Sequence, residues 1–209
     1  MINKPATGIT MVFGVDPQNC FGHPNGGLYV KGGEKVVEPG NKLIAYGLEN
    51  DYLIGFSCDW HPNNSDHFKP IGPWPRHGVA GTWDAEFLSG LNVPATSYIF
   101  RKGTKKHEHG YDPFEGKTDD GIGIENVLVH FGVEKIFAWG IAIDYCVKAF
   151  VLHALKLGYK VYLVIDASRS VNANLGDEQK AIEEMEATGV KLITTEEVLN
   201  GKFQTTLAD

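Results

Sequence analysis

The sequence has few cysteines, and their arrangement excludes a disulfide-stabilised domain. Only Cys20, Cys58 and Cys146 occur among the 209 residues. An odd number of cysteines without close spacing does not form a disulfide framework, so we expect free thiols and a reducing compartment. Each cysteine is therefore a candidate for core packing or for catalysis.

The sequence also lacks the features of a membrane or secreted protein. No apolar run approaches the length needed to span a bilayer, and residues 1–10 lack a basic region followed by an apolar stretch. No internal repeat and no interdomain linker is visible. We therefore expect a cytoplasmic protein that forms a single domain over residues 1–209, with its core from about residue 9 to residue 195.

Positive charge is scarce as well. The 19 Lys and Arg residues stand against 26 Asp and Glu residues, which leaves a formal net charge of -7, and no basic stripe is present. Nucleic acids and anionic membranes bind basic surfaces, so the sequence argues against both as partners. We expect a small neutral or cationic molecule as the partner, and the sequence leaves formation of a homo-oligomer open.

Strand-like runs alternate with amphipathic helical patterns along the chain. The expected strands cover residues 9–15, 52–58, 97–101, 135 to the glycine at 140, 160–165 and 190–193. The expected helices cover residues 34–49, 122–132, 147 to the glycine at 158, and 176–188. This order predicts an α/β fold, a single three-layer domain in which helices cover both faces of a mainly parallel six-stranded sheet.

Two segments interrupt this alternation. Residues 61–83 are rich in Pro, Gly, Asn and His, and an irregular segment of this length inside a compact domain is usually functional or disordered. Its aromatic and histidine content favours a functional loop. Residues 103–120 are expected to form a second excursion near the same sheet edge, and residues 202–209 to form a loose tail.

Cys146 is the candidate nucleophile. The segment from residue 135 to residue 146 runs an apolar strand through a glycine break into a helix, which places this cysteine in the first helical turn. Free backbone N–H groups and the helix dipole stabilise a thiolate there, so we expect a lowered pKa. The alternative is a small buried hydrophobe. Cys58 faces the opposite side of its strand from Asp59 and is expected to pack in the core, and no chemistry is assigned to Cys20.

Three charged residues follow other predicted strands. Asp16, Asp59 and Lys102 each come directly after a strand, and the carboxyl ends of parallel strands meet at one edge of a sheet. We therefore expect these side chains to converge on Cys146. Asp16 is the candidate general base and Lys102 is expected to hold the carboxylate and thiolate charges. The alternatives are that Asp16 caps a turn before proline and that Lys102 is solvated.

A candidate metal site lies after the second strand. Asp59 and His61 are two residues apart and point to the same side of an extended backbone, and His67 and His77 follow in the irregular loop. One carboxylate with up to three imidazoles suits one divalent ion, Zn²⁺, Fe²⁺ or Mn²⁺. The alternative is a turn cap with ordinary loop histidines. Five histidines without a spaced partner are expected on the surface or on a helix face: His23, His107, His109, His130 and His153.

Several short motifs occur in a specific order and spacing. They are Asp16 in D-P-Q-N, Asp59 and His61 in D-W-H-P, His77 in W-P-R-H-G-V, Lys102 in R-K-G, and Cys146 in G-I-A-I-D-Y-C-V-K. From about residue 9 to residue 195 the chain resembles the nicotinamidases of the isochorismatase-like cysteine hydrolase superfamily. The resemblance implies a catalytic triad of Asp16, Lys102 and Cys146. It also implies the metal ligands Asp59, His61 and His77, with His67 as a fourth ligand used by some members.

The resemblance further implies a reaction and a substrate site. The reaction is hydrolysis of nicotinamide to nicotinate and ammonia through a thioester in NAD salvage, with pyrazinamide as a second substrate. The resemblance implies a cis peptide between Ile141 and Ala142, so that the amides of Ala142 and Cys146 form an oxyanion hole. The substrate contacts that it implies are Phe21, Trp74, Ile141 and Tyr145.

Two other functions stay open at this stage. One is a hydrolase of the same superfamily that acts on another small amide or on a vinyl ether. The other is a metal-holding binding or scaffold protein in which Cys146 is inert. Alkylation discriminates the scaffold from the enzymes, because an activated thiol reacts at neutral pH and a buried inert thiol resists.

Overall fold

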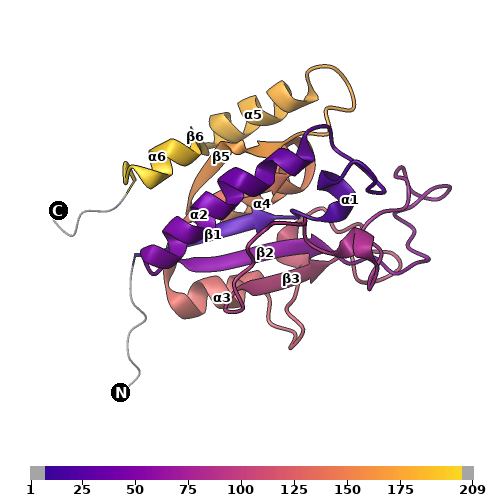
Figure 1. Cartoon of the computed structure of the whole chain (residues 1–209), viewed down its shortest axis with the longest axis horizontal. Coiled ribbons are helices and arrows are strands. Elements are labelled where there is room, and N and C mark those ends of the chain that lie inside the picture. Colours follow the sequence, from indigo (N-terminus) through magenta and orange to yellow (C-terminus); the bar gives the residue numbers. More distant parts are fainter. Residues whose placement is uncertain (1–7, 204–209) are drawn as a thin grey trace.

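Six strands form one parallel sheet at the centre of the protein. The computed structural model describes residues 8–203 (Figure 1). The strands are β1 (Ile9–Val15), β2 (Leu53–Asp59), β3 (Tyr98–Lys102), β4 (Val133–Ile141), β5 (Lys160–Arg169) and β6 (Lys191–Ile193). They are ordered β3-β2-β1-β4-β5-β6, and each neighbouring pair is parallel. The predicted α/β fold with a six-stranded, mainly parallel sheet is therefore confirmed.

Helices cover both faces of this sheet, and each face has its own apolar cluster (Figure 1). On one face α3 (Ile124–Phe131), α4 (Lys148–Lys156) and α5 (Asp177–Thr188) pack on β1, β4 and β5, and Phe13 stacks on Phe150 with ring centroids 4.2 Å apart. On the other face α2 (Val37–Glu49) and α6 (Thr195–Leu199) pack around Trp139. The three layers follow from the apolar residues that each strand presents to both faces.

Short elements account for the differences from the predicted pattern. The sequence pattern did not predict α1 (Asn19–Gly22), α6, or the 3₁₀ turns at Trp83–Ala85 and Pro113–Glu115, because helices of three to five residues are too short to show periodicity. The helix expected over residues 34–49 divides into a 3₁₀ turn at Gly33–Val36 and α2. A π-helical turn, η4 (Ile143–Val147), joins β4 to α4. The amide of Val147 donates to the carbonyl of Ala142, five residues earlier, at 3.0 Å, which is the π-helical spacing.

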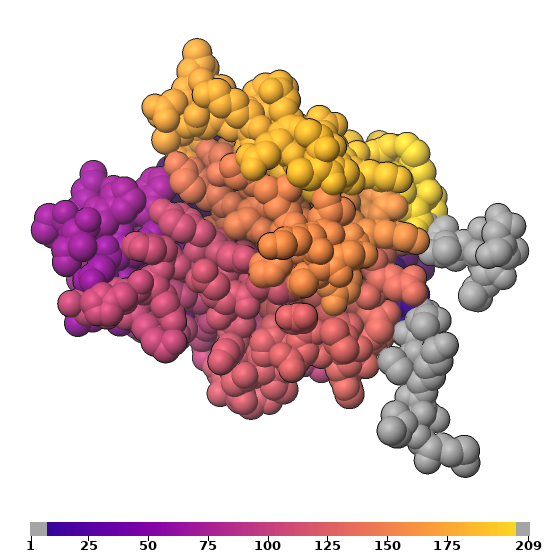
Figure 2. All heavy atoms as spheres, turned by 180° about the vertical axis from the view of Figure 1, so that it is seen from behind, coloured from indigo at the N-terminus to yellow at the C-terminus, as the bar shows by residue number. Residues whose placement is uncertain are grey.

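The two irregular segments lie against each other at the carboxyl ends of the strands. The amide of Asp66 donates to the carbonyl of Lys106 at 2.8 Å, and the indole N–H of Trp74 donates to the hydroxyl of Tyr111 at 2.7 Å. In the view from behind, the loop after β2 forms the purple projection at one end of the molecule (Figure 2). The segment from residue 61 to residue 83 is thus an ordered loop that packs on the second excursion.

No helix among residues 8–203 combines the length and the apolar character that crossing a membrane requires. We expected no leader segment over residues 1–10. Residues 1–7 of this segment lie outside the described part of the chain. The same holds for residues 204–209 of the predicted tail.

Candidate active site

The strand order brings the four predicted reactive residues together. Asp16 directly follows β1, Asp59 and Lys102 are the last residues of β2 and β3, and Cys146 lies in the turn after β4. These four strands are consecutive neighbours in the sheet. From β1 the chain continues to β2 and β3 on one side of β1, and it then crosses to β4 on the other side. The carboxyl ends of β1 and β4 therefore form a topological switch point, which is where ligands bind in open α/β sheets.

Lys102 lies at the centre of the buried cluster of charged side chains. Its Nζ lies 2.8 Å from Oδ2 of Asp16 and forms a second ion pair with Asp59. The same Nζ donates to the carbonyl of Gly110 at 2.6 Å and lies 3.5 Å from Sγ of Cys146. The ammonium group therefore touches both carboxylates and the candidate nucleophile.

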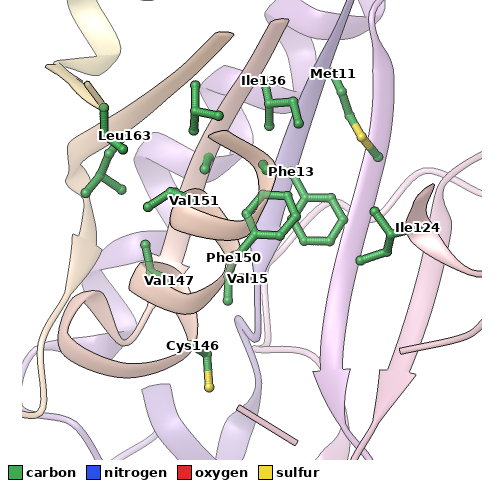
Figure 3. Packing of buried hydrophobic residues seen from close by; sticks show 14 of the residues in the cluster. Met11, Phe13, Val15, Ile124, Ile136, Cys146, Val147, Phe150, Val151 and Leu163 are labelled. Carbon is green, nitrogen blue, oxygen red and sulfur yellow. The ribbon is translucent and has the colours of Figure 1, made fainter. Parts of the chain in front are cut away.

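Burial dominates the acid–base properties of this cluster. It raises the pKa of the Cys146 thiol well above 9.0, and the nearby Lys102 ammonium offsets only part of this rise. The expectation of a lowered pKa from the helix terminus was therefore wrong, because Cys146 is buried in a π-helical turn at the edge of the apolar cluster (Figure 3). Burial also raises the pKa of Asp16. A thiol with a raised pKa needs a neighbouring base, and Asp16 is placed to act as one.

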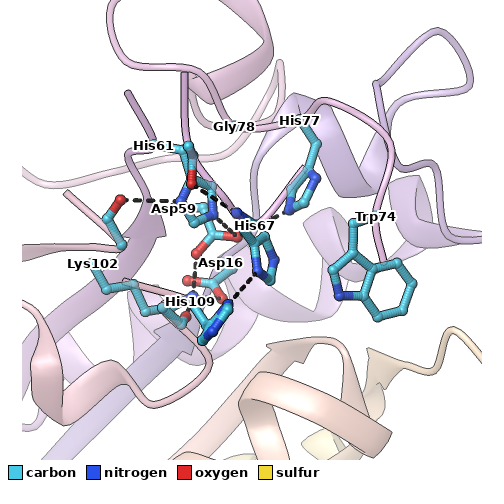
Figure 4. A network of polar contacts seen from close by, with 12 residues as sticks. Asp16, Asp59, His61, His67, Trp74, His77, Gly78, Lys102 and His109 are labelled. Atoms are coloured by element: carbon cyan, nitrogen blue, oxygen red, sulfur yellow. Dashed lines mark hydrogen bonds and ion pairs between the residues drawn. The ribbon is translucent and has the colours of Figure 1, made fainter. Parts of the chain in front are cut away.

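The three loop histidines form a candidate metal centre. One ligand atom from each of His61, His67 and His77 lies within 4.8 Å of the others, and all three residues are buried (Figure 4). The Nδ1 of His61 bonds the carbonyl of Gly103 at 3.0 Å, and the Nδ1 of His77 bonds the carbonyl of Pro75 at 2.7 Å. Both rings therefore carry the proton on Nδ1 and leave Nε2 as a free lone pair.

Asp59 connects the histidines with Lys102. Its Oδ1 pairs with Lys102, and its Oδ2 lies 3.5 Å from Nε2 of His61 and 3.6 Å from Nε2 of His77. The Nε2 of His61 is buried and makes no hydrogen bond in the structure. Three imidazole nitrogens around one point, with a carboxylate oxygen of Asp59 beside two of them, suit a tetrahedral or open divalent metal site, so the residues present fit such an ion.

Gln18 holds this carboxylate in place and is a residue to which the sequence reading gave no role. Its side-chain oxygen accepts from the amide of Asp59 at 2.7 Å, and its side-chain NH₂ donates to the carbonyls of Asp59 and Ala85 at 2.9 and 2.8 Å. Its position in the sequence, two residues after Asp16, is the feature that could have indicated a role at this site. The amide side chain fixes the end of β2 and with it the direction of Asp59.

A pocket opens beside the cysteine and the histidines. Among the residues that line it are Asp59, His67, His77 and Cys146, together with Phe21, Trp74, Ile141, Ala142 and Tyr145. The four substrate contacts that the resemblance implied, Phe21, Trp74, Ile141 and Tyr145, therefore all line this pocket. The peptide between Ile141 and Ala142 is cis, as it also implied. Mostly aromatic and aliphatic walls with a few polar groups suit a small planar molecule.

Tyr111 and His109 also line the pocket, and the sequence patterns did not single out either residue. Tyr111 stacks against Tyr145 with ring centroids 6.1 Å apart and accepts the hydrogen bond of Trp74. His109 lies beside His67 at the mouth of the pocket and is exposed, so its expected surface position is confirmed. Both belong to the second irregular segment, whose contact with the first loop has no periodic signal in the sequence.

The other two cysteines lie in the interior. Cys20 is buried in the cluster around α2, and Cys58 is buried on β2 with its thiol directed at the carbonyl of Phe100. Burial raises the pKa of Cys58 to about 12. Neither cysteine is among the residues that line the pocket.

Comparisons with known proteins identify the family to which this chain belongs. Residues 10–197 match the family model of the isochorismatase domain. A nicotinamidase from Acinetobacter baylyi is 34% identical over 203 residues, which is 88% of this chain and 92% of the relative.

Two solved structures are similar as well. The structure of the pyrazinamidase of Pyrococcus horikoshii in complex with zinc has a TM-score of 0.81 and 37% identity, and the match covers 88% of this chain and 98% of that one. The structure of PnC1 from L. infantum in complex with nicotinate has a TM-score of 0.78 and 27% identity, and covers 92% and 98% of the two chains. The chain belongs to the isochorismatase family, and nicotinamidases are among its relatives there.

Proposed function

We propose that this protein is a nicotinamidase, an amidohydrolase that converts nicotinamide and water to nicotinate and ammonia. The observation that carries the proposal is the position of the Cys146 thiol. It lines a small aromatic pocket within 3.5 Å of Lys102, whose ammonium also pairs with Asp16. The similarity to the Acinetobacter baylyi nicotinamidase and to a nicotinate complex supports this choice of substrate.

The proposed mechanism uses Cys146 as the nucleophile. Asp16 takes the thiol proton, and the thiolate sulfur attacks the carboxamide carbon to form a tetrahedral intermediate. The backbone amides of Ala142 and Cys146 stabilise its oxyanion. The C–N bond then breaks, Asp16 returns the proton to the leaving nitrogen, and ammonia departs. A water molecule, deprotonated by Asp16, hydrolyses the thioester and restores the thiol.

Lys102 has an electrostatic role in this scheme. Burial opposes its charge, but Asp16 and Asp59 raise its pKa well above 10.5, so it stays an ammonium ion. This positive charge lies next to the sulfur, where it stabilises the thiolate as it forms. The buried Cys146 thiol can therefore transfer its proton to Asp16 while Lys102 stabilises the thiolate, and the transfer does not require bulk water.

We propose that Asp59, His61, His67 and His77 hold one divalent metal ion. When bound, such an ion supplies an electrophile for the ring nitrogen of a pyridine or pyrazine carboxamide. The donor set suits Zn²⁺, Fe²⁺ and Mn²⁺, and the zinc complex of the Pyrococcus horikoshii relative supports zinc. The pocket walls at Phe21 and Trp74 are then positioned to contact the faces of the substrate ring.

Pyrazinamide is the proposed second substrate, because its ring carries a nitrogen at the same position as that of nicotinamide. Hydrolysis of another small amide is the competing function within the family. A cytoplasmic location and a homo-oligomeric state stay predictions.

Ammonia release from nicotinamide tests the proposal. The wild-type chain is expected to release ammonia, and Cys146→Ala is expected to lose about 10³-fold or more of the rate, because no other nucleophile lies at that position. Cys58→Ala is the matched control, since this thiol lies outside the pocket, and it should keep the wild-type rate. A wild-type rate in Cys146→Ala would exclude the mechanism, and activity on other small amides without activity on nicotinamide would favour the competing function.

A further inference from the structure

His109 is a pocket residue that the proposed mechanism does not use. Its Nδ1 lies 3.4 Å from the Nδ1 of His67, and the two ring centroids are 5.6 Å apart (Figure 4). A hydrogen bond between two imidazole nitrogens requires that one carries the proton and the other a lone pair. The tautomer of His67 therefore depends on which ring donates.

The other two histidines of the cluster are fixed in a different way. The Nδ1 of His61 and the Nδ1 of His77 both face backbone carbonyls, those of Gly103 and Pro75. A carbonyl oxygen can only accept, so each of these rings must place its proton on Nδ1 and its lone pair on Nε2. His67 is the exception in this cluster, because its Nδ1 faces an imidazole that can donate or accept.

We propose that His109 positions His67 as a metal ligand by accepting a hydrogen bond from its Nδ1–H. In this arrangement the proton of His109 is on Nε2, and the lone pair of His67 is on Nε2 beside the other two histidines. This inference rests on the proposed metal site and adds a residue to it. His109 acts through His67 and is thus a positioning residue.

The backbone around His109 is held so that this contact can persist. The next residue, Gly110, accepts a hydrogen bond from Nζ of Lys102 at 2.6 Å, and Tyr111 accepts one from Trp74. The two residues that follow His109 are therefore fixed, one to the end of β3 and the other to the aromatic wall. A partner anchored in this way fixes the orientation of a ligand ring, and removal of such partners commonly weakens metal binding by about 10–100-fold.

Zinc affinity, measured by competition with a chromogenic chelator, tests this role without reference to activity. We expect His109→Ala to weaken Zn²⁺ binding by about 10–100-fold. His109→Asn should restore most of the affinity, because the side-chain oxygen of asparagine can take the place of Nδ1 as an acceptor. His107→Ala is the control for the loop, since this exposed histidine two residues away pairs with Asp66 and not with His67, and it should bind Zn²⁺ as the wild type does.

The tautomer of His67 gives a second readout. In the metal-free chain labelled with ¹⁵N-histidine, we expect the His67 signals of a protonated Nδ1 and an unprotonated Nε2, and a mixture of tautomers in His109→Ala. Equal zinc affinity in wild type and His109→Ala, equal losses in His107→Ala and His109→Ala, or no rescue by asparagine would each overturn the inference. Absence of Zn²⁺ binding by the wild type would instead reject the proposed metal site.

Discussion

Asp59 and Lys102 are register partners at the ends of β2 and β3, and their side chains form a buried ion pair. This pair joins the two halves of the site. The carboxylate faces the histidine cluster with its other oxygen, and the ammonium faces Asp16 and Cys146. With both carboxylates ionised, the buried cluster holds two negative charges and one positive charge, and a divalent ion in the histidine cluster would reverse that imbalance.

Removal of the charge at Lys102 is expected to affect both stability and activity. Lys102→Met leaves Asp16 and Asp59 buried without their partner, so the free energy of unfolding should fall by about 3–5 kcal/mol. The rate of ammonia release should fall by about 10³-fold. Urea denaturation and a steady-state assay measure the two effects. Lys42→Met, which breaks an exposed ion pair with Glu38, is the control and should change stability by less than about 1 kcal/mol. Unchanged stability of Lys102→Met would contradict the buried network.

Gly103 leaves room for His61, and a side chain there should disturb the metal centre. A Cβ at this position would lie 2.3 Å from Cε1 of His61, and the residue has a φ of +64°. Gly103→Ala should therefore weaken zinc binding by about tenfold or more. Gly121→Ala is the matched control, because Gly121 has a φ of +86° with nothing within 4 Å of its Cβ. Gly121→Ala should lose about 1 kcal/mol of stability from its left-handed backbone, and Gly103→Ala should lose more because of the contact with His61. Equal zinc affinity in the two variants would show that the contact with His61 is unimportant.

Iodoacetamide should label Cys146 in preference to the other two cysteines. All three thiols have raised pKa values, but only Cys146 lines the pocket and has Asp16 and Lys102 beside it. Intact-mass analysis at neutral pH should show one carbamidomethyl group and loss of activity. Asp16→Asn should slow the labelling by about tenfold or more, because the base that removes the proton is missing. Labelling of Cys20 or Cys58 at the same rate would contradict the assignment.

The pH dependence of kcat/KM should show the ionisation of Asp16. This carboxyl must be deprotonated to accept the thiol proton, and burial raises its pKa above 3.8, so the rate should fall on the acid side at a higher pH than for an ordinary carboxyl. Because the pKa of Cys146 is well above 9.0, no rise should accompany thiol ionisation between pH 7 and 9. Metal content measured at each pH separates loss of the ion from protonation of Asp16. A tenfold rise in rate per pH unit over pH 7–9 would show that solvent, rather than Asp16, removes the proton.

The sequence predicted the central elements because their patterns are long and repeated. The apolar run that became β4 and the helical stripe that became α4 each extend over about nine residues, and both lie where the pattern indicated. The run at β5 is longer than expected and continues to Arg169, since its last residues are polar and lose the apolar signal. Short elements such as α1 gave no signal at all.

The types of reactive residue and their positions at the ends of strands follow from the sequence, because alternation of strands and helices is a local property. Which of these residues meet depends on how the strands and loops pack in three dimensions. The order of the strands makes β3, β2, β1 and β4 neighbours, and packing of two loops against each other brings His109 to His67. Burial, which no local pattern encodes, raises the pKa of Cys146, where the first-turn position alone predicted a lowered one.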